Sequence, residues 1–421
     1  MSAHALDERV VVVGGGQAGG ELVARLRAGG HAGEIVLIGT EPHLPYTRPP
    51  LSKTFLRGEA QAEELFLRSA RFYEEQDITV LADTTVNSID LHAKTLECDD
   101  GTSLAWDKLV LATGGRPRRL PDATLNDASN VHYVRTIDDA ARLRAGTRPG
   151  TRFAVVGGGY VGLEVTSVLR RLGAEVTVIE AADRLLARVT SPPVSEFFRQ
   201  LHEEEGVDVR LGSQVESYEY VDGDVAALRL SDGSVIEVDQ VLIGIGMIPN
   251  DDLARAAGLT VDNGIVVDEY CRAGSDVYAI GDVSRHPDPQ NGGFRRLESM
   301  PNAAAQARHA AEDILGTPAP YVDVPWFWSD QYDIKFQCAG LNTGYDEIVV
   351  RGDITIGSQF TVFYLKDGRV CSVDSLGRPA EYAAGKALIA GAAPADRQAL
   401  ADPSIPLRAS RRSRETSVGI R

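Results

Sequence analysis

Short apolar runs that end in glycine-rich turns set the pattern of the first half of the chain. Residues 10–13 are all valine and are followed by Gly14-Gly15-Gly16-Gln17-Ala18-Gly19, after which the apolar spacing of residues 21–28 predicts a helix. Residues 35–38 predict the next strand, and Glu41 follows it. A strand, a glycine turn, a helix, a strand and an acidic residue, in this order, are typical of a βαβ unit that binds a dinucleotide.

The same pattern begins again roughly 143 residues later. Residues 153–156 predict a strand, Gly157-Gly158-Gly159-Tyr160-Val161-Gly162 forms the turn, and residues 163–172 predict the helix. A further strand over residues 176–179 ends at Glu180. Two such units predict two dinucleotide sites in one chain, and one flavin with one nicotinamide nucleotide fits them best.

The glycine turns predict the residues that hold each nucleotide. Glycines let backbone N–H groups approach a pyrophosphate, toward which the following helix directs the positive end of its dipole. The predicted binding residues of the first turn are Gly14, Gly16, Ala18 and Gly19, and those of the second are Gly159 and Gly162. Thr40 or Glu41 is expected to contact the first ribose, and Glu180 is expected to accept hydrogen bonds from the second.

The residues after Glu180 bear on the choice between NADH and NADPH. A site that binds the 2′-phosphate of NADPH would need arginine or lysine at this point, where the sequence has Ala181-Ala182. The sequence therefore favours NADH. Arg184 and Arg188 follow, and they can contact a pyrophosphate or a 2′-phosphate or remain solvated charges.

Three further apolar segments resemble the ends of buried strands and predict the division into domains. They are residues 109–115, 241–250 and 276–282. The segment 241–250, which contains Gly246, is expected to return the chain to the first domain. We therefore predict an α/β fold with two Rossmann-like domains: a discontinuous FAD domain over residues 1–115 and 249–322, and an NAD domain over residues 116–248.

The pattern of apolar and polar residues changes after about residue 322. Short alternating runs predict a small antiparallel sheet with a helix near residues 382–390, so residues 323–421 are expected to form a small α+β interface domain. Its last part, from Arg408 onward, is rich in arginine and is predicted to be a mobile basic tail.

Charge and hydropathy exclude several classes of protein. The net charge of −17 disfavours nucleic acid and anionic membranes as partners. The apolar runs fall far short of the roughly 18 residues that cross a bilayer, and the N-terminal segment offers no basic and apolar leader, so a cytoplasmic location is expected. The four cysteines are far apart and no metal site is predicted.

Four segments resemble the FAD-containing NADH:ferredoxin reductases of oxygenase systems. They are Pro45-Tyr46-Thr47-Arg48-Pro49-Pro50-Leu51-Ser52-Lys53, Ala112-Thr113-Gly114-Gly115-Arg116-Pro117, Gly281-Asp282 and Pro325-Trp326-Phe327-Trp328-Ser329-Asp330-Gln331. The resemblance extends over nearly the whole chain. It implies an enzyme that transfers a hydride from NADH to FAD and then single electrons to a [2Fe–2S] ferredoxin, which supplies a cytochrome P450 or another oxygenase.

The resemblance also implies the catalytic residues. Lys53 matches a lysine near the flavin N5 edge, and Glu164 matches its carboxylate partner; the alternative is an interdomain salt bridge without a catalytic role. Arg48 is expected to contact the flavin phosphates or ring, or else a loop carbonyl. The absence of a paired redox cysteine, and of a cysteine within Arg48-Pro49-Pro50-Leu51, excludes disulfide and peroxide chemistry, so the electrons must leave to an external acceptor.

Further cofactor contacts are implied by the resemblance in the same way. Asp282 is expected to bond the ribityl hydroxyls, and Met300 to supply a backbone contact where a helix begins. Val86 and Arg135 match positions on the adenine and flavin sides, and would otherwise be a core residue and a surface charge. The remaining expected cofactor contacts are Arg188, Gly246 and Trp328.

A docking surface for the ferredoxin is the last expectation. Arg68, Arg308 and Arg408 match docking positions, although each alone can be a solvated charge, and Trp326, Phe327 and Trp328 can form an apolar contact surface or a packed core. The chain is expected to be a monomer or a weak dimer.

Two alternative functions remain open. One is a reductase whose acceptor is rubredoxin or a dioxygenase component. The other is an NADH-sensing redox interaction protein that resembles apoptosis-inducing factor.

Overall fold

The computed structural model describes residues 7–407, which form two compact units. The first unit contains residues 7–121, together with Tyr133–Ala145 and Ile245–Asp323. The second unit contains Asp122–His132, Gly146–Gly244 and residues 324–407. Each unit is therefore built from segments that are separated in the sequence.

A five-stranded parallel sheet forms the centre of the first unit. Its strands, in spatial order, are β19 (Val277–Ala279), β7 (Lys108–Leu111), β1 (Val10–Val13), β2 (Ile35–Ile38) and β3 (Ile78–Leu81). All four residues of β1 are buried, as expected for a strand that is covered on both faces. Because the strands are parallel, their carboxyl ends lie along one edge, where the glycine turn and Glu41 follow β1 and β2.

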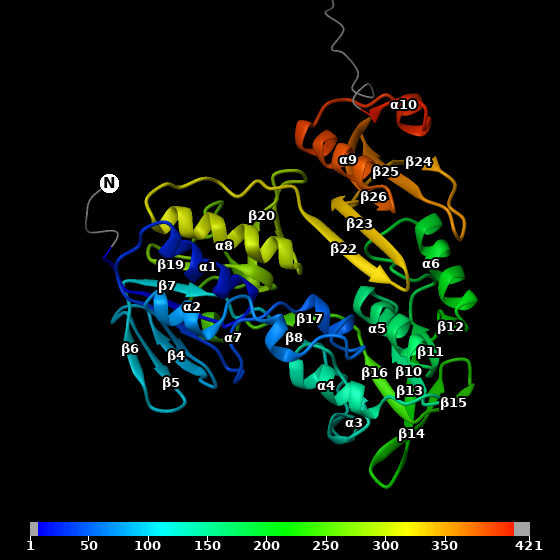
Figure 1. The fold of residues 1–421 in the computed structure, drawn as a ribbon, viewed down its shortest axis with the longest axis horizontal. Helices are drawn as coiled ribbons and strands as arrows, with labels where there is room; N and C mark the ends of the chain where they lie inside the picture. The colour runs from blue at the N-terminus through cyan, green and yellow to red at the C-terminus, as the bar shows by residue number, and fades with distance from the viewer. Residues whose placement is uncertain (1–6, 408–421) are drawn as a thin grey trace, which may run out of the picture. The chain divides into compact units, whose positions relative to one another are not determined.

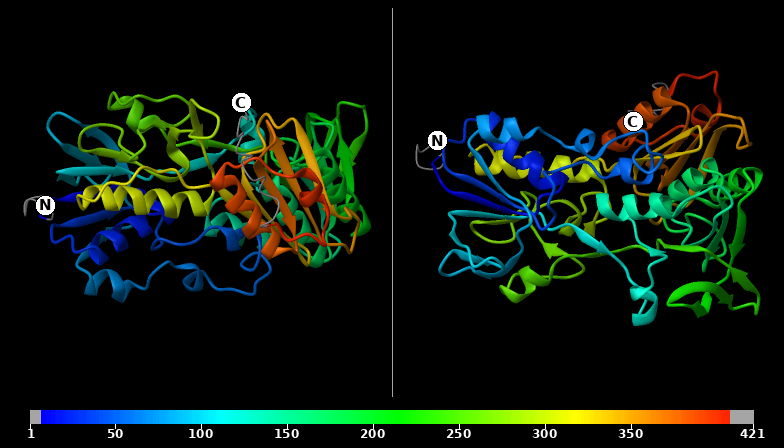
Figure 2. Two further views of the ribbon diagram at one scale, coloured as in Figure 1. Left: turned by 90° about the horizontal axis from the view of Figure 1, so that it is seen from above. Right: turned by 60° about the horizontal axis from the view of Figure 1, so that its bottom comes forward.

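Alternate residues of β1 supply the two hydrophobic cores of this unit. Val10 and Val12 pack with helix α1 (Gln17–Ala28) and helix α8 (Met300–Ile314), which lie side by side over one face of the sheet (Figures 1 and 2). Val11 and Val13 face the opposite core, which includes residues of the small antiparallel sheet of β4 (Val86–Asp90), β5 (Thr95–Cys98) and β6 (Ser103–Ala105).

Shorter elements complete the first unit. The helices are α2 (Ala70–Glu75), α4 (Ile137–Gly146) and α7 (Asp252–Ala256), with 3-10 turns at Pro49–Ser52, Ala62–Leu65 and Gly281–Val283. The strands are β8 (Gly115–Pro117) paired with β17 (Met247–Pro249), and β18 (Ile265–Val266), β20 (Ser284–Pro287) and β21 (Phe294–Arg296) in a second small sheet.

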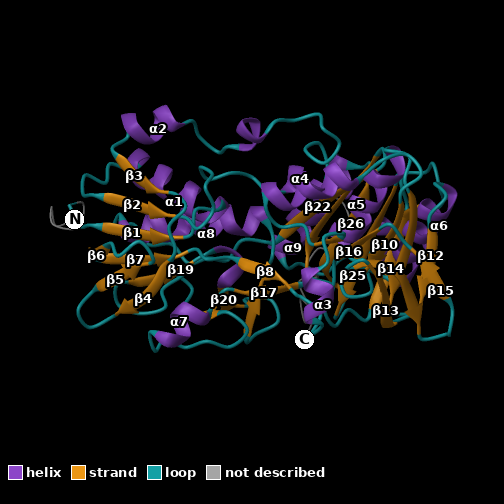
Figure 3. Cartoon of the chain, turned by 90° about the horizontal axis from the view of Figure 1, so that it is seen from below, coloured by secondary structure: helices purple, strands orange, loops and turns teal. Residues whose placement is uncertain are grey.

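The second unit contains a parallel sheet of the same kind. Its spatial order is β12 (Asp208–Leu211), β11 (Glu175–Glu180), β10 (Arg152–Val156), β16 (Gln240–Ile243) and β9 (Val131–His132). The helices are α3 (Ala123–Asp127), α5 (Tyr160–Arg171) and α6 (Pro192–Glu204). A three-stranded antiparallel sheet of β13 (Val215–Val221), β14 (Asp224–Leu230) and β15 (Val235–Glu237) lies beside them (Figure 3).

The C-terminal part of the second unit is a five-stranded antiparallel sheet. Its spatial order is β22 (Trp326–Gln331), β23 (Ile334–Gly340), β26 (Arg369–Leu376), β25 (Phe360–Lys366) and β24 (Glu347–Gly352), and helices α9 (Pro379–Gly391) and α10 (Arg397–Ala401) pack on it. The predicted fold class, with two Rossmann-like parts and a small α+β part, is confirmed.

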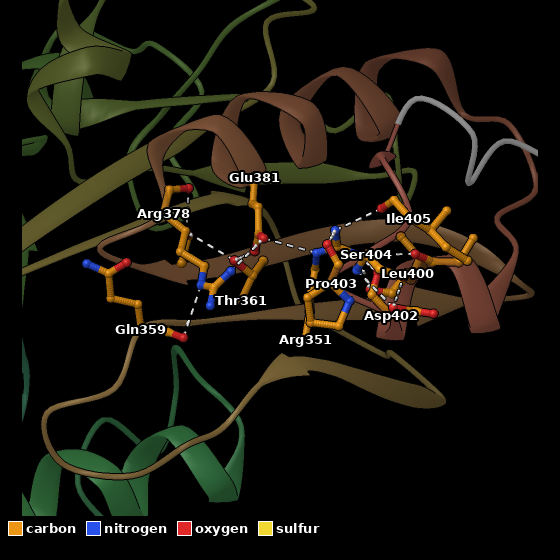
Figure 4. Close-up of polar contacts among 12 residues, drawn as sticks. Arg351, Gln359, Thr361, Arg378, Glu381, Leu400, Asp402, Pro403, Ser404 and Ile405 are labelled. Atoms are coloured by element: carbon orange, nitrogen blue, oxygen red, sulfur yellow. Dashed lines mark hydrogen bonds and ion pairs between the residues drawn. The ribbon is translucent and has the colours of Figure 1, made fainter.

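Arg351 joins strand β24 to the chain after α10 (Figure 4). Its side chain is 4% exposed, and its guanidinium donates to the carboxylate of Glu381 at 3.0 Å. It also donates to five backbone carbonyls, those of Ala399, Leu400, Asp402, Pro403 and Ile405. One buried cation therefore satisfies carbonyl groups that α10 and the following turn leave without helical partners.

Within residues 7–407 no helix is long and apolar enough to cross a membrane. The same part of the chain contains no cluster of three or more histidine, cysteine, aspartate or glutamate residues that could hold a metal ion.

Candidate functional site: two nucleotide cradles

The first glycine turn is shaped so that two of its positions accept only glycine. Gly14 has φ +125°, and a Cβ atom there would lie 2.1 Å from the carbonyl oxygen of Ala112. A Cβ atom on Gly19 would lie 2.1 Å from the carbonyl oxygen of Gly14. These close approaches hold β1, β7 and α1 together at the edge where the sheet's carboxyl ends lie.

Gly16 differs from these two glycines because the space beside it is open. No atom lies within 4 Å of a Cβ built on Gly16, and this residue begins α1 without a side-chain cap. The first N–H groups of a helix have no partner within the helix. An open space in front of uncapped N–H groups fits a pyrophosphate, so this turn fits the FAD that the sequence predicts.

A cluster of two arginines and two carboxylates lies in the same unit. Arg48 donates to Glu41 at 2.7 Å, to the hydroxyl of Tyr46 at 2.8 Å and to the carbonyl oxygen of Arg135 at 2.5 Å. Tyr46 donates to the other oxygen of Glu41 at 2.5 Å, and burial raises the pKa of this tyrosine, so that it remains a donor. Arg135 in turn lies 3.2 Å from Asp282.

This cluster changes the expectation for the first ribose. Both oxygens of Glu41 accept hydrogen bonds from Tyr46 and Arg48, whereas Thr40 is exposed, with its hydroxyl 3.5 Å from that of Thr85. Thr40 therefore has the more accessible group of the two. Tyr46 lies within the segment Pro45–Lys53 that carries the family resemblance, but its contacts with Glu41 and Arg48 become visible only in the structure.

Buried polar groups fix the turn that contains Asp282. It belongs to the 3-10 turn Gly281–Val283, and the backbone N–H of Gly281 donates to Gln306 at 2.7 Å. Gln306 also accepts from Ser284 and lies 3.1 Å from His286. The sequence gives no local signal for Gln306, because its partners become its neighbours only when α8 packs on the sheet.

The other predicted flavin contacts of the first unit occupy varied positions. Val86 is 9% exposed and packs in the core. Met300 is the first residue of α8, whose N-terminus is capped by the side chain of Ser299. Gly246 has φ +106° and accepts a hydrogen bond from the backbone N–H of Arg118.

Lys53 ends the 3-10 turn that begins at Pro49, in the first unit. Glu164 lies in α5 of the second unit, is 3% exposed and accepts a hydrogen bond from Ser329 at 2.7 Å. The predicted pairing of Lys53 with Glu164 stays a prediction. Ser329 was not identified as a partner of Glu164, although it lies within the quoted segment 325–331.

The second glycine turn repeats the geometry of the first. A Cβ atom on Gly162 would lie 2.3 Å from the carbonyl oxygen of Gly157, whereas no atom lies within 4 Å of a Cβ built on Gly159. Gly159 begins α5 without a side-chain cap. This turn therefore also fits the pyrophosphate of a dinucleotide, the predicted NADH.

Glu180 is fixed at the end of β11 in front of this turn. Its carboxylate accepts hydrogen bonds from the backbone N–H groups of Gly158, at 2.7 Å, and Ala182, at 2.8 Å. The carboxylate is only partly buried. It can thus accept further hydrogen bonds from a ribose diol, as the sequence predicts.

The two arginines after Glu180 differ from each other. Arg184 closes its own loop, because it donates to the carbonyl oxygens of Thr190 and Ala187 and to the hydroxyl of Ser195. Arg188 is exposed, and its guanidinium has no hydrogen-bond or ion-pair partner among residues 7–407. Arg184 therefore has a structural role within the loop, and Arg188 is the cation that remains accessible.

The three aromatic residues of β22 contact different neighbours. Trp326 and Trp328 lie with their ring centroids 5.7 Å apart, and Lys386 lies over the ring of Trp326. Phe327 instead contacts Tyr160, at the start of α5, with a centroid distance of 4.7 Å. The ring of Phe327 also lies 6.3 Å from that of Trp328, so the three aromatic rings form one connected group.

The predicted docking arginines are engaged in local contacts. Arg68 donates to the carbonyl oxygen of Leu67 and lies over the ring of Phe72. Arg308 forms an ion pair with Asp323 at 2.8 Å. Arg408 lies outside the described residues.

Residues 8–307 match the family model of pyridine nucleotide-disulphide oxidoreductases, and residues 326–411 match that of the reductase C-terminal domain. The chain is 43% identical to putidaredoxin reductase CamA of Pseudomonas putida, over 96% of each chain. It is 41% identical to the ferredoxin--NAD(+) reductase component of the p-cumate 2,3-dioxygenase system of Pseudomonas putida, over 95% of this chain and 98% of that one.

A solved structure gives the same result. The crystal structure of the covalent putidaredoxin reductase–putidaredoxin complex matches with a TM-score of 0.93 and 43% identity, over 95% of this chain and 97% of that one. The predicted resemblance is thus confirmed, and the family implies FAD and NAD(H), for which the two glycine turns are suited. The chain belongs to the pyridine nucleotide-disulphide oxidoreductase family, within its group of ferredoxin reductases.

Proposed function

We propose that this chain is an NADH-dependent, FAD-containing reductase of a [2Fe–2S] ferredoxin that supplies a cytochrome P450 or another oxygenase. The observation that carries the proposal is the pair of uncapped glycine turns, Gly14–Gly19 and Gly157–Gly162, in a chain that also has a reductase C-terminal domain. Bound FAD accepts electrons as a pair from a hydride and can release them singly. Relatives that match along nearly the whole chain are ferredoxin reductases by name.

The cysteines support an external acceptor. All four are free, and burial raises the pKa of each thiol. A nucleophilic cysteine needs an accessible thiolate. Internal dithiol chemistry, which the family name suggests, therefore has no support in this chain, and the electrons must leave to another molecule.

Each predicted site residue of the FAD domain, together with Glu164 and Trp328, has a proposed role in cofactor binding or catalysis. The N–H groups at Gly16 hold the FAD pyrophosphate, with Gly14, Ala18 and Gly19 shaping the turn, and Thr40 or Glu41 contacts the ribose. Arg48, Arg135 and Asp282 orient the flavin, while Lys53 and Glu164 act beside its reacting edge. The further proposed contacts are those of Val86, Gly246, Met300 and Trp328.

The preference for NADH rests on Glu180. Two backbone N–H groups fix its carboxylate. The side chain could rotate away from a 2′-phosphate only by losing both of these hydrogen bonds. A fixed negative charge favours a ribose diol over a phosphate. Arg188 is proposed to contact the pyrophosphate, together with the turn at Gly159 and Gly162.

Ferredoxin docking is proposed to involve Trp328, Arg68, Arg308 and Arg408, in a chain that is a monomer or a weak dimer. Arg308 can exchange its ion pair with Asp323 for an acidic group of the partner. We propose that residues 1–115 and 249–322 bind FAD, residues 116–248 bind NADH, and residues 323–421 form the interface domain.

Anaerobic stopped-flow spectroscopy tests the proposal. The FAD-loaded protein is mixed with NADH or NADPH and then with a [2Fe–2S] ferredoxin or a rubredoxin. Bleaching of the flavin that is faster with NADH, followed by reduction of the ferredoxin, is expected. A charge-transfer band that persists in air without onward transfer would overturn the proposal in favour of a redox-sensing protein, and transfer to rubredoxin alone would change the acceptor.

A further inference from the structure

A continuous series of hydrogen bonds connects Glu164 with Tyr332 inside the second unit. The hydroxyl of Ser329 donates to Glu164 at 2.7 Å, and the amide nitrogen of Gln331 donates to Ser329 at 3.2 Å. The Nε2 atom of His202 lies 2.9 Å from the amide oxygen of Gln331, and its Nδ1 atom lies 3.0 Å from the hydroxyl of Tyr332. We call these five residues the Glu164 chain.

Two helices, one strand and the turn after it bring the members of the Glu164 chain together. Glu164 comes from α5 and His202 from α6, while Ser329 and Gln331 are two residues apart on β22 and so point to the same face of this strand. Tyr332 lies in the turn after β22, and its ring centroid is 5.2 Å from that of His202.

Burial makes each member depend on the next one. Ser329 and His202 are 0% exposed, Gln331 is 1% exposed and Glu164 is 3% exposed. At these positions water does not replace a lost partner, and a buried polar group that loses its hydrogen bond destabilises the fold. The Glu164 chain therefore has one arrangement in which all of its hydrogen bonds are made.

The hydrogen bonds of the Glu164 chain all run in one direction from donor to acceptor. The amide of Gln331 uses its nitrogen as the donor to Ser329, so its oxygen accepts from a proton on Nε2 of His202. Burial lowers the pKa of His202 to about 4, against the opposite effect of the hydrogen bond with Gln331, so the ring is neutral at pH 7. Its Nδ1 atom is then an acceptor for the hydroxyl of Tyr332, which burial keeps protonated by raising its pKa. Every donor in the chain points toward Glu164.

We propose that the Glu164 chain is a positioning device: His202, in its Nε2–H form, orients Gln331 and Ser329 so that a hydroxyl donor is always directed at the carboxylate of Glu164. The proposal rests on the function proposed above, in which Glu164 acts beside the flavin. The amide of Gln331 cannot pass a proton along without becoming an imidic acid. The chain therefore fixes and polarises the carboxylate, and it is not a path for protons.

The first test uses nuclear magnetic resonance and needs no activity. Histidine labelled with ¹⁵N in the full chain reports the tautomer of each ring, and the variant His202→Gln assigns the signal of His202. We expect an Nε2–H signal that does not titrate between about pH 5.5 and 8, because the pKa lies far below this range. Glu164→Gln and Ser329→Ala are expected to shift it, because they reverse or break the chain at the far end.

A matched control comes from the neighbouring sheet. Ser372 is 4% exposed and donates to the carbonyl oxygen of Ala339 at 2.9 Å, outside the chain. Ser372→Ala removes a buried hydroxyl of the same kind and is expected to leave the His202 signal unchanged. An Nδ1–H tautomer, or a His202 signal that is the same in wild type, Glu164→Gln and Ser329→Ala, would overturn the proposal.

The second test measures flavin reduction by NADH in a mutant cycle. Ser329→Ala removes the hydroxyl that donates to the carboxylate of Glu164, so it is expected to slow reduction about tenfold. In a Glu164→Gln background the same substitution is expected to have no further effect, and Ser329→Thr restores the rate because it keeps the hydroxyl. Equal slowing in both backgrounds would contradict action through Glu164. If wild type is not reduced by NADH, the proposed function fails, whereas the resonance test still decides whether the chain is coupled.

Discussion

The hydroxyl of Thr190 donates to the carboxyl group of Asp374 across 2.5 Å, although 184 residues separate them in the sequence. The hydroxyl of Tyr364 lies 2.5 Å from the same oxygen and accepts from the backbone N–H of Ser191. The end of the loop that follows Glu180 is thus joined to the C-terminal sheet by a buried polar cluster. Asp374 is 1% exposed, and burial raises its pKa to about 7, against the opposing hydrogen bonds of Thr190 and Tyr364.

Asp374 makes stability depend on pH. Its pKa is higher in the folded chain than in the unfolded one, so its contribution to stability is complete below about pH 4 and is lost as pH rises through 7. We expect Asp374→Asn to remove this loss, so that the stability of the variant relative to wild type increases by up to about 2.5 kcal/mol between pH 5 and 8. Urea unfolding at the two pH values measures the change. Asp353→Asn, an exposed position of the same sheet region, is the control, and parallel curves for Asp374→Asn and wild type would contradict the assignment.

The two kinds of glycine in the first turn are expected to respond differently to a methyl group. Gly16→Ala should fold normally, because its backbone is extended and the space is open, but FAD should bind at least about tenfold more weakly because the methyl group occupies the pyrophosphate position. Gly14→Ala should unfold at a lower temperature even without FAD, because its Cβ would meet the carbonyl group of Ala112. Melting of the apoprotein and titration with FAD separate the two effects. Wild-type FAD affinity in Gly16→Ala would show that the cradle is misassigned.

The two ends of β11 provide a matched pair for nucleotide recognition. Glu180→Ala is expected to weaken NADH binding about tenfold to a hundredfold, because charged hydrogen bonds contribute about 1.5–3 kcal/mol. The loss for NADPH should be smaller, since the variant also removes a repulsive charge. Glu175, at the other end of the strand, is exposed, and Glu175→Ala should leave both affinities unchanged. Fluorescence titration with each nucleotide gives the ratio, and an equal loss for both nucleotides would contradict selection by Glu180.

Arg351 is expected to be the most sensitive arginine of the C-terminal sheet. Arg351→Met removes the buried cation that pairs with Glu381 and donates to five carbonyl groups, so a loss of about 3–5 kcal/mol is expected, as for other broken buried ion pairs. Asp402 keeps the N–H of Ile405 as a donor, and Glu381 keeps Arg378 and Thr361. Arg397 is 69% exposed and pairs with Glu347, so Arg397→Met should cost less than about 1 kcal/mol. Urea unfolding gives these values, and hydrogen exchange over residues 399–407 should accelerate only in Arg351→Met.

The sequence was sufficient for the features that depend on neighbouring residues. The valine run of β1, the glycine turns and the acidic end of β11 are local patterns, and each is required by the backbone geometry around it. The sequence was not sufficient for Arg184, since spacing along the chain does not reveal whether a guanidinium faces a ligand or its own loop. The partners Ser329 and Glu164 are 165 residues apart, and packing of β22 against α5 brings them together.

Strand β19 is made after all the strands of the parallel sheet in the second unit, yet it pairs with β7 of the first unit. While the ribosome adds the chain between them, the edge of β7 has no permanent partner, although its backbone groups are ready to pair with any extended segment nearby. Domains of a nascent chain usually fold in the order of their synthesis. Here the parallel sheet encoded in the middle of the chain can be completed first, whereas the parallel sheet that begins at the N-terminus is complete only after β19 has been made.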